Sequence, residues 1–387
     1  MYLFEEPEVT YIDPWALSYD QRIQMLLKRE KRIAYYTTCP DNSTFRYRVF
    51  NMVEVLNQRS REYSASWFAQ EDFSKIEEVI QHTQILVICR VQFSFYTETL
   101  LVLAKKYGVR VVYDIDDYVF DPGSASIVMQ ALDQPFRDAT DADWNFWFSY
   151  TSRHGELLKK CDSLLCTHSY LAEKLSRYAE KPVGIIPNFL NSFQSDISQE
   201  IWKRKYQAGF KRSTQIHIGY FSGTPTHNRD FQIVSHTLAD LLETHPQVSL
   251  RIAGFLDLPP HLQSFQDRVE FIPFQNFIAL QNSIAQVEIN LVPLQLNSFT
   301  NCKSELKFFE AAVVGTQTVA SPTFAYANAI HHGHNGYLAH EDEWSTVLDE
   351  IIENLDTWPD RAEKVYEETW ETYHGSNHVE SIISSLT

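Results

Sequence analysis

Short apolar runs alternate with polar loops and amphipathic segments through most of the chain. Several runs in the first half have the length and the β-branched or aromatic content of buried strands. These runs are residues 32–38, 84–89, 109–113, 163–166 and 183–186. Between two of them, residues 97–107 form a segment typical of a helix. A strand, a polar loop and a helix, repeated in this order, predict a doubly wound parallel sheet.

A second series of apolar runs begins after a polar, helical stretch near residue 200. Its runs are residues 215–221, 248–254, 269–274, 287–291 and 318–320. A chain of 387 residues is long enough for two domains that each bury a core. The predicted parts are a first domain with an N-terminal helical extension (1–195), a linker (196–213), a second domain (214–360) and a C-terminal helix (361–387).

Composition and charge argue against several classes of protein. The formal net charge of −17 is unsuited to a broad surface for nucleic acid or anionic lipid. No run approaches the ~20 apolar residues of a membrane span, and the N-terminal sequence MYLFEEPEVTY is acidic where a signal peptide is basic. The five cysteines are scattered without metal-ligand spacing. We therefore expect a cytoplasmic protein without zinc, disulfides, a nucleic-acid partner or a transmembrane segment, and with at most weak peripheral membrane contact.

A short helix near residue 310 combines packing with charge. Leu306, Phe309 and Val313 recur at helical spacing, while Lys303, Lys307 and Glu310 fall together on an adjacent face. Gly315 just beyond the periodic residues suits a left-handed helix end, and a buried strand follows. The lysines at the start of this helix indicate a site for a diphosphate, because ammonium groups and free backbone amides would point the same way.

The motif Lys307-x-x-Glu310, followed by Gly315 and by the run TVAS at 318–321, resembles the donor-binding helix of the family 4-like, group 1 type glycosyltransferases of the GT-B fold. The resemblance implies two Rossmann-like domains that face each other across a cleft, with a C-terminal helix that can cross back onto the first domain. It also implies that Glu310 holds the ribose of a sugar nucleotide, and that the basic residues before it, Lys303 and Lys307, face its diphosphate. Ser304 is a further candidate for donor binding.

Cys302 is a departure from this family pattern. The family has a second glutamate at the position that Cys302 occupies, so the contacts to the donor sugar differ here. The spacing of Lys307 and Glu310 is equally compatible with an ordinary amphipathic helix that carries a solvated ion pair.

Loops after strands supply further candidates in the first domain. The loop S-T-F-R-Y-R with Ser43 and Arg46 follows the first strand, and Asn188 in a Pro-Asn pair ends the last strand. Ligands of doubly wound sheets lie beyond the carboxyl ends of the strands, and the resemblance places both segments at the cleft. We therefore expect these three residues on the acceptor side. The alternatives are an arginine that bridges surface carboxylates and an ordinary turn asparagine.

An acidic loop follows the strand at 109–113. Asp114 and Asp116 could be the metal-binding pair of a GT-A glycosyltransferase, a cleft loop of a GT-B protein, or a solvated turn. We favour the cleft loop, because a GT-A fold leaves the second half of the chain unexplained. Strict alternation would direct Asp114 and Asp116 to one side and Asp117 to the other. Asp116 and Asp117 are catalytic candidates, and Asp114 is assigned to the acceptor side.

The second domain contains a glycine loop after its first strand. Gly223 permits close backbone approach, Thr224 offers a hydroxyl, and Arg229 is the basic residue nearest to the family pattern, although it could be a surface arginine. The resemblance places the nucleotide base near Phe274. Arg229 and Lys307 are the candidates that would stabilise the leaving phosphate.

These features predict transfer of a hexose or deoxyhexose from a nucleotide-diphosphate sugar to a glycan or lipid-linked acceptor, in surface polysaccharide or glycoconjugate synthesis. The resemblance implies a retaining reaction, and we expect neither a metal nor a cofactor beyond the co-substrate. A catalytically silent GT-B scaffold, which Cys302 would favour, and a sugar-nucleotide-binding protein are the alternatives.

Overall fold

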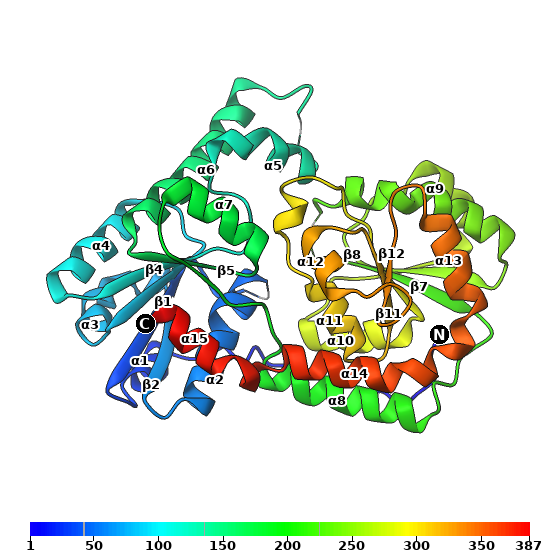
Figure 1. The fold of residues 1–387 in the computed structure, drawn as a ribbon, viewed down its shortest axis with the longest axis horizontal. Coiled ribbons are helices and arrows are strands. Elements are labelled where there is room, and N and C mark those ends of the chain that lie inside the picture. Colours follow the sequence, from blue (N-terminus) through cyan, green and yellow to red (C-terminus); the bar gives the residue numbers. More distant parts are fainter. Residues whose placement is uncertain (42, 135, 224) are drawn as a thin grey trace.

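The computed structural model describes residues 1–41, 43–134, 136–223 and 225–387, and contains two α/β domains side by side (Figure 1). Each domain has a six-stranded sheet in which all named strand pairs are parallel. The strand order is β2-β1-β3-β4-β5-β6 in the first sheet and β12-β11-β10-β7-β8-β9 in the second. The prediction of two doubly wound sheets is therefore confirmed.

The first domain is built from strands and helices that alternate along the chain. Its strands are β1 (Lys31–Thr37), β2 (Tyr63–Ala69), β3 (Ile85–Cys89), β4 (Arg110–Asp114), β5 (Ser163–Cys166) and β6 (Val183–Ile185). Its helices are α1 (Tyr19–Leu26), α2 (Asn51–Arg59), α3 (Ile76–Gln81), α4 (Phe95–Tyr107), α5 (Ala125–Ala131), α6 (Asp141–Lys160) and α7 (Ser169–Ala179), and a π-helical turn, η1 (Arg46–Phe50), precedes α2.

The second domain follows the same plan. Its strands are β7 (Ile216–Ser222), β8 (Val248–Gly254), β9 (Val269–Ile272), β10 (Ile289–Val292), β11 (Gln317–Ala320) and β12 (Tyr337–Leu338). The helices from the linker onward are α8 (Ser192–Gln207), α9 (Asn228–Thr244), α10 (Phe277–Gln286), α11 (Leu306–Ala312), α12 (Phe324–Ala329), α13 (Trp344–Glu353), α14 (Pro359–Tyr373) and α15 (Val379–Leu386).

Both domains also contain 3-10 helical segments. These are η2 (Gln70–Lys75), η3 (Pro122–Ser124), η4 (Pro260–Arg268), η5 (Thr300–Cys302), η6 (Leu355–Thr357) and η7 (Gly375–His378).

Strand β2 is absent from the predicted strands because serines interrupt its apolar residues. Ser64 and Ser66 are fully buried, and the Ser64 hydroxyl donates to the carbonyl of Leu26 at 2.6 Å. A hydroxyl that pairs with a nearby carbonyl can enter a core at little cost, although it looks polar in the sequence. The first sheet therefore extends one strand beyond β1.

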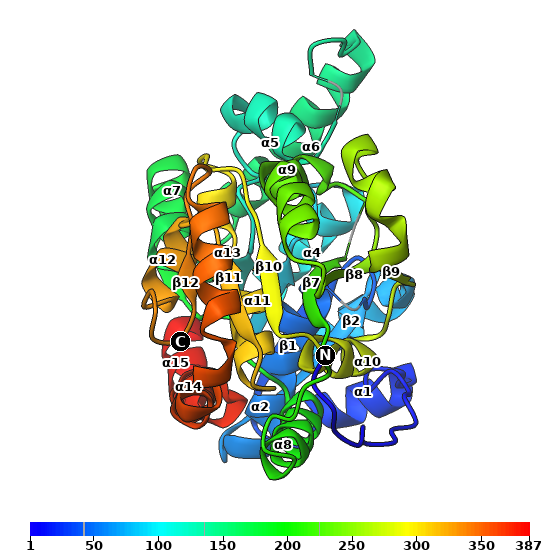
Figure 2. The ribbon, with the colours of Figure 1, turned by 90° about the vertical axis from the view of Figure 1, so that its right-hand side faces the viewer.

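Two long helices join the domains on one side of the molecule. Helices α8 and α14 run side by side beneath the second domain as far as its junction with the first (Figure 1), and Trp202 stacks on Tyr366 with ring centroids 4.5 Å apart. Helix α15 then packs on α2 and β6 of the first domain. At the other end of the molecule, α5 and α6 project from the first domain, as Figures 1 and 2 both show.

A buried lysine fixes the linker helix to the second domain. The ammonium of Lys205 in α8 donates to the carbonyls of Ala285, Val314 and Gly315 at 2.8–3.1 Å. These carbonyls lie at the C-terminal ends of α10 and α11, where helices leave acceptors unpaired. Gly315 has φ 68°, the left-handed conformation that the sequence predicts, and a Cβ there would lie 2.8 Å from the ring of Trp202.

Substitution of Gly315 by alanine should destabilise the protein more than the same change at Gly209. Both glycines have left-handed φ values, of 68° and 64°, but a Cβ at Gly209 meets nothing within 4 Å. We expect a loss of about 1 kcal/mol for Gly209→Ala from backbone strain, and about 1–3 kcal/mol more for Gly315→Ala from the clash with Trp202. Urea unfolding measures both; equal losses would contradict the packing of α8 against Gly315.

Candidate active site

A cavity of about 580 Å³ lies between the two domains, within the usual size range of small-molecule sites. The strand order of each sheet reverses at one point, between β1 and β3 in the first domain and between β7 and β10 in the second. Loops that follow β1, β7 and β10 line the cavity, with Thr44, Gly223 and Leu294 among their residues. The cavity therefore occupies the place where open α/β sheets bind ligands.

Most of the residues singled out in the sequence lie on this cavity. Those that line it are Ser43, Arg46, Asp116, Asp117, Asn188, Gly223, Phe274, Lys303, Ser304, Lys307 and Glu310. Thr224 lies outside the described residues. Arg229 and Asp114 are not part of the lining. Residues far apart in the sequence are thus gathered from both domains.

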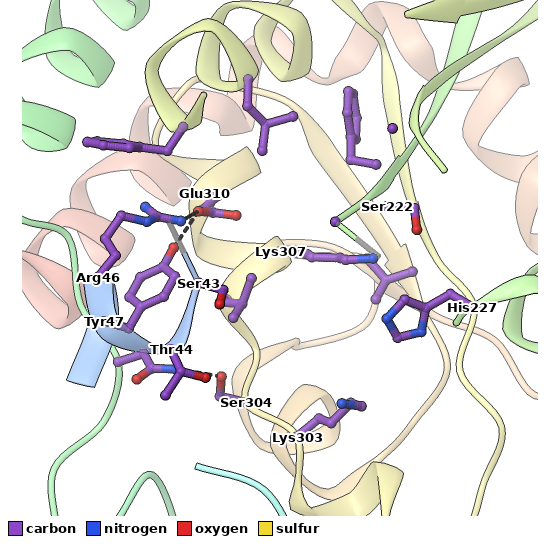
Figure 3. A pocket seen from close by; sticks show the side chains of 18 of the residues that line it. Ser43, Thr44, Arg46, Tyr47, Ser222, His227, Lys303, Ser304, Lys307 and Glu310 are labelled. Atoms are coloured by element: carbon purple, nitrogen blue, oxygen red, sulfur yellow. Dashed lines mark hydrogen bonds and ion pairs between the residues drawn. The ribbon is translucent and has the colours of Figure 1, made fainter. Parts of the chain in front are cut away.

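Glu310 of α11 is buried, and the side chains that donate hydrogen bonds to its carboxylate come from outside the second domain. Its Oε1 accepts hydrogen bonds from Arg46 Nη2 at 3.2 Å, from Gln194 Nε2 at 3.2 Å and from the hydroxyl of Tyr47. Figure 3 shows the Arg46 and Tyr47 contacts as dashed lines. Burial is the main cause that raises the pKa of Tyr47 well above its usual value, so this hydroxyl stays protonated and donates. A buried carboxylate needs such partners to remain charged.

Two lysines and a histidine face the cavity from the second domain (Figure 3). Burial, together with the charge of Lys303, lowers the pKa of Lys307 to about 8. Burial likewise lowers the pKa of His227, although its Nδ1 lies 3.0 Å from a carboxylate oxygen of Asp230. With a pKa of about 8, Lys307 is mostly cationic at neutral pH, and the lowered pKa leaves His227 neutral. A cationic Lys307 suits a site that receives an anion.

The acidic loop after β4 faces these cations from the first domain. Asp116 accepts from Arg90 Nη1 at 2.6 Å and from the hydroxyl of Thr44 at 2.9 Å. Burial alone would raise the pKa of Asp116, but Arg90 holds it below its usual value. Asp117 lies 3.2 Å from the same Arg90 nitrogen and 3.4 Å from Lys303 Nζ across the cavity.

The strict alternation predicted for this loop is wrong. β4 ends at Asp114, so the two-residue period does not continue, and Asp116 and Asp117 share Arg90 instead of pointing apart. Asp114 is fully buried and forms two hydrogen bonds of 3.0 and 3.1 Å with Arg48. Arg48 also donates to the carbonyl of Ile186 at 2.6 Å. Asp114 therefore joins the ends of β4 and β6 and does not face an acceptor.

Arg229 lies away from the cavity, contrary to the expectation that it faces the diphosphate. Its guanidinium donates to the carbonyl of Gln130 in α5 at 2.9 Å. The backbone amides of Asn228 and Arg229 donate to the carboxylate of Asp133, which has a left-handed φ of 55°. Asp133 thus caps the N-terminus of α9 across the domain boundary. The start of α9 turns Arg229 toward α5, and His227 takes the place on the cavity.

Other contacts join the two domains at or near the cavity. Asn188 donates to the hydroxyl of Ser304 at 2.8 Å, and His168 Nε2 lies 3.1 Å from the carbonyl oxygen of Cys302. The Cys302 thiol is fully buried with Phe299 against the core of the first domain and is not part of the lining. The side chain at this departure from the family pattern therefore packs instead of facing a ligand.

Several residues that line the site or contact its side chains were not among the predicted site residues, and Tyr47, Gln194 and His227 are the clearest cases. Tyr47 looks like a core aromatic residue, Gln194 lies in a polar segment just before the predicted linker, and His227 competes with Arg229 in the same loop. Tyr47 stands next to Arg46 in the S-T-F-R-Y-R loop, which is a local signal that could have been used. Gln194 has no such signal, because its contact with Glu310 spans 116 residues.

The described part of the chain holds no group of three or more His, Cys, Asp or Glu residues placed to bind a metal ion. Within the same residues, no helix is both long and apolar enough to cross a membrane.

Comparison with known proteins gives a family match for the second domain. No curated protein matches the chain. Residues 215–357 match the family model described as Glycosyl transferases group 1. This segment contains Lys303, Lys307 and Glu310, together with the glycine loop after β7.

Solved structures resemble the whole chain. Anabaena Alr3699/HepE in complex with UDP and glucose has a TM-score of 0.62 at 13% identity, covering 92% of this chain and 98% of that one. Sucrose-phosphate synthase from Thermosynechococcus elongatus has a TM-score of 0.58 at 12% identity, with coverages of 91% and 96%. WaaG, a glycosyltransferase involved in lipopolysaccharide biosynthesis, has a TM-score of 0.53 at 13% identity, with coverages of 91% and 99%.

At these identities the structural likeness establishes the fold, and the match over residues 215–357 establishes the family of the second domain. The two parallel sheets and the cavity between them agree with both findings. The second domain thus matches the group 1 glycosyltransferases, and the chain as a whole has the fold of the GT-B glycosyltransferases.

Proposed function

We propose that this protein transfers a sugar from a nucleotide-diphosphate sugar to an acceptor hydroxyl in the cavity between its domains. The observation that carries the proposal is the joint presence of Lys303, Lys307 and Glu310 on one wall and of Asp116 and Asp117 on the other. The crystal structure of Alr3699/HepE in complex with UDP and glucose supports a nucleotide sugar as the donor.

Lys303 and Lys307 would bind the diphosphate of the donor. Negative charge grows on the leaving phosphate as the glycosidic bond breaks, and a fixed cation stabilises it in proportion to its proximity. Lys307 extends into the cavity beside the ring of Tyr220, with its Nζ 5.4 Å from the ring centroid. A charge-assisted hydrogen bond from such a group contributes roughly 1.5–3 kcal/mol.

Glu310 would accept the hydroxyl groups of the ribose, and Phe274 would lie near the base. The ring of Phe274 is more than half exposed and lies 5.9 Å from that of Phe255, so two aromatic faces are accessible beside the cavity. Aromatic rings of this kind favour stacking with planar bases.

The acidic loop would orient the acceptor in a retaining reaction. Asp116 already accepts two hydrogen bonds and has a lowered pKa, which makes it a weak base. In a retaining mechanism of this kind the leaving phosphate can take the proton of the acceptor hydroxyl, so no carboxylate base is needed. The lysines would neutralise the diphosphate without a metal ion, and no cofactor is required besides the donor.

The acceptor would be a glycan or a lipid-linked glycan, in surface polysaccharide or glycoconjugate synthesis in the cytoplasm, with a hexose or deoxyhexose as the transferred sugar. The role of WaaG in lipopolysaccharide biosynthesis supports this class. A catalytically silent scaffold would bind a nucleotide sugar in the same cavity without turnover, and the buried Cys302 favours that second candidate.

Release of nucleoside diphosphate from a panel of UDP- and GDP-sugars tests the proposal. We expect release with at least one donor, at the same rate with and without EDTA, because cationic side chains bind the diphosphate. Loss of release in EDTA with recovery in magnesium or manganese would contradict metal independence. Binding without hydrolysis or transfer would identify a silent scaffold. Thermal shift selects the donor, since a ligand at a hundred times its Kd stabilises by ~2.7 kcal/mol.

The affinity for a nucleoside diphosphate should fall as the pH rises above about 8. Lys307, with its pKa of about 8, is charged below that pH and neutral above it, while a bound anion raises its pKa in the complex. The Kd should therefore rise by up to about tenfold per pH unit between about pH 8 and 9.5. Calorimetry across this range measures it, with Lys307→Met as the control that should flatten the profile. An unchanged profile in Lys307→Met would assign the titration to another group.

Substitution of Asp116 or Asp117 by asparagine should have a modest kinetic effect. Loss of an orienting hydrogen bond of ~1 kcal/mol costs around fivefold and raises the acceptor KM, whereas loss of a general base costs ~10²–10⁴-fold in kcat. We expect the smaller effect for both variants in steady-state assays. A hundredfold or larger loss of kcat at either position would indicate an inverting reaction with that carboxylate as the base.

A further inference from the structure

The two oxygens of the Glu310 carboxylate have different surroundings. Oε1 accepts from Arg46, Tyr47 and Gln194, whereas no described residue donates to Oε2. Figure 3 shows one oxygen directed at Arg46 and Tyr47 and the other directed away from them. A carboxylate has about four acceptor positions, so Oε2 keeps its capacity for a ligand. Oε2 is therefore the oxygen of Glu310 that remains available to accept a hydrogen bond from a ligand in the cavity.

The guanidinium of Arg46 is held in place by several neighbouring side chains. Its Nη1 donates to Gln194 Oε1 at 2.8 Å, and its guanidinium lies 4.7 Å from the ring centroid of Phe277. Gln194 is held through its backbone amide, which donates to Asn191 at 2.8 Å. Arg46 and Glu310 are each only 4% exposed, so water does not compete for these bonds. The two side chains and Gln194 form a closed triangle in which each position depends on the others.

We propose that Arg46 and Gln194 are positioning residues that hold Glu310 for recognition of the ribose, and that they set the preference of this enzyme for ribonucleotide over deoxyribonucleotide donors. The inference rests on the proposed function, in which Glu310 accepts hydroxyl groups of the ribose. A buried site built to pair with a hydroxyl rejects an analogue that lacks it, because its own acceptor is then left unpaired. Such rejection requires a carboxylate that cannot turn away toward another donor.

The residues that hold Glu310 in place come from outside its own domain. Arg46 comes from η1 of the first domain and Gln194 from the linker helix α8, whereas Glu310 belongs to the second domain. Ribose selectivity would therefore depend on a contact across the cavity, available only while the domains are together. The charge of Arg46 also favours any anion in the cavity, but that effect is equal for ribose and deoxyribose. The ratio of the affinities for a ribonucleotide and its deoxy analogue therefore reports the positioning of Glu310 and not the general attraction of Arg46 for anions.

Calorimetry with UDP and GDP and with their 2′-deoxy and 3′-deoxy analogues tests the proposal on the full chain. For wild type we expect the ribonucleotide of the preferred base to bind about tenfold or more tightly than one of its deoxy analogues. Arg46→Met keeps the length and the packing on Phe277 but removes the donors, and should lower this ratio to about that of Glu310→Gln. Gln194→Met should lower it as well, and serves as a second variant that leaves both charges in place.

Lys303→Met is the matched control, because Lys303 lines the same cavity and does not contact Glu310. It should weaken ribo- and deoxyribonucleotides equally and keep the wild-type ratio. A wild-type ratio in both Arg46→Met and Gln194→Met, with a lost ratio in Glu310→Gln, would overturn the positioning role while leaving the proposed function intact. No binding of UDP or GDP to wild type, or an unchanged ratio in Glu310→Gln, would overturn the proposed function and this inference with it.

Discussion

The contact between Arg46 and Glu310 is the interaction on which the site depends. A carboxylate with 4% exposure can stay charged only beside a cation and hydrogen-bond donors, and all of those donors come from the first domain or the linker helix. The same contact therefore stabilises the charge of Glu310 and brings the two sheets together. The second domain provides the carboxylate, but the first domain decides how it is oriented.

Local charge within an acidic protein explains how the cavity can receive an anion. The chain carries a formal net charge of −17, yet Lys303 and Lys307 meet at one wall of the cavity. Asp117 balances part of this charge from the opposite wall, 3.4 Å from Lys303. A diphosphate that enters the cavity would pair with Lys303 in place of Asp117, so binding exchanges one ion pair for another. Opposite charges at such short range interact strongly even though the protein as a whole repels anions.

The architecture and much of the site could be predicted from the sequence because their signals are local. Apolar runs predicted both doubly wound sheets, and left-handed Gly315 was recognisable at the end of the α11 segment. Ligands of parallel sheets lie at strand ends, so loops after predicted strands were the right places to search. Strand β2 was not predicted because its two buried serines look polar in the sequence, although the Ser64 hydroxyl pairs with the carbonyl of Leu26.

Tertiary structure decided which of the charged residues face the ligand. Asp114 and Asp116 are two residues apart, yet one pairs with buried Arg48 and the other with Arg90 on the cavity, because β4 ends between them. Arg229 turns to α5 because Asp133 caps α9 from the other domain.

By itself, the sequence determined the two folds and the face of α11 that carries Lys307 and Glu310, since helical and strand periods are properties of neighbouring residues. Only the assembled structure determined that Arg46, Tyr47 and Gln194 converge on one oxygen of Glu310, since contacts across 116 to 264 residues leave no local pattern.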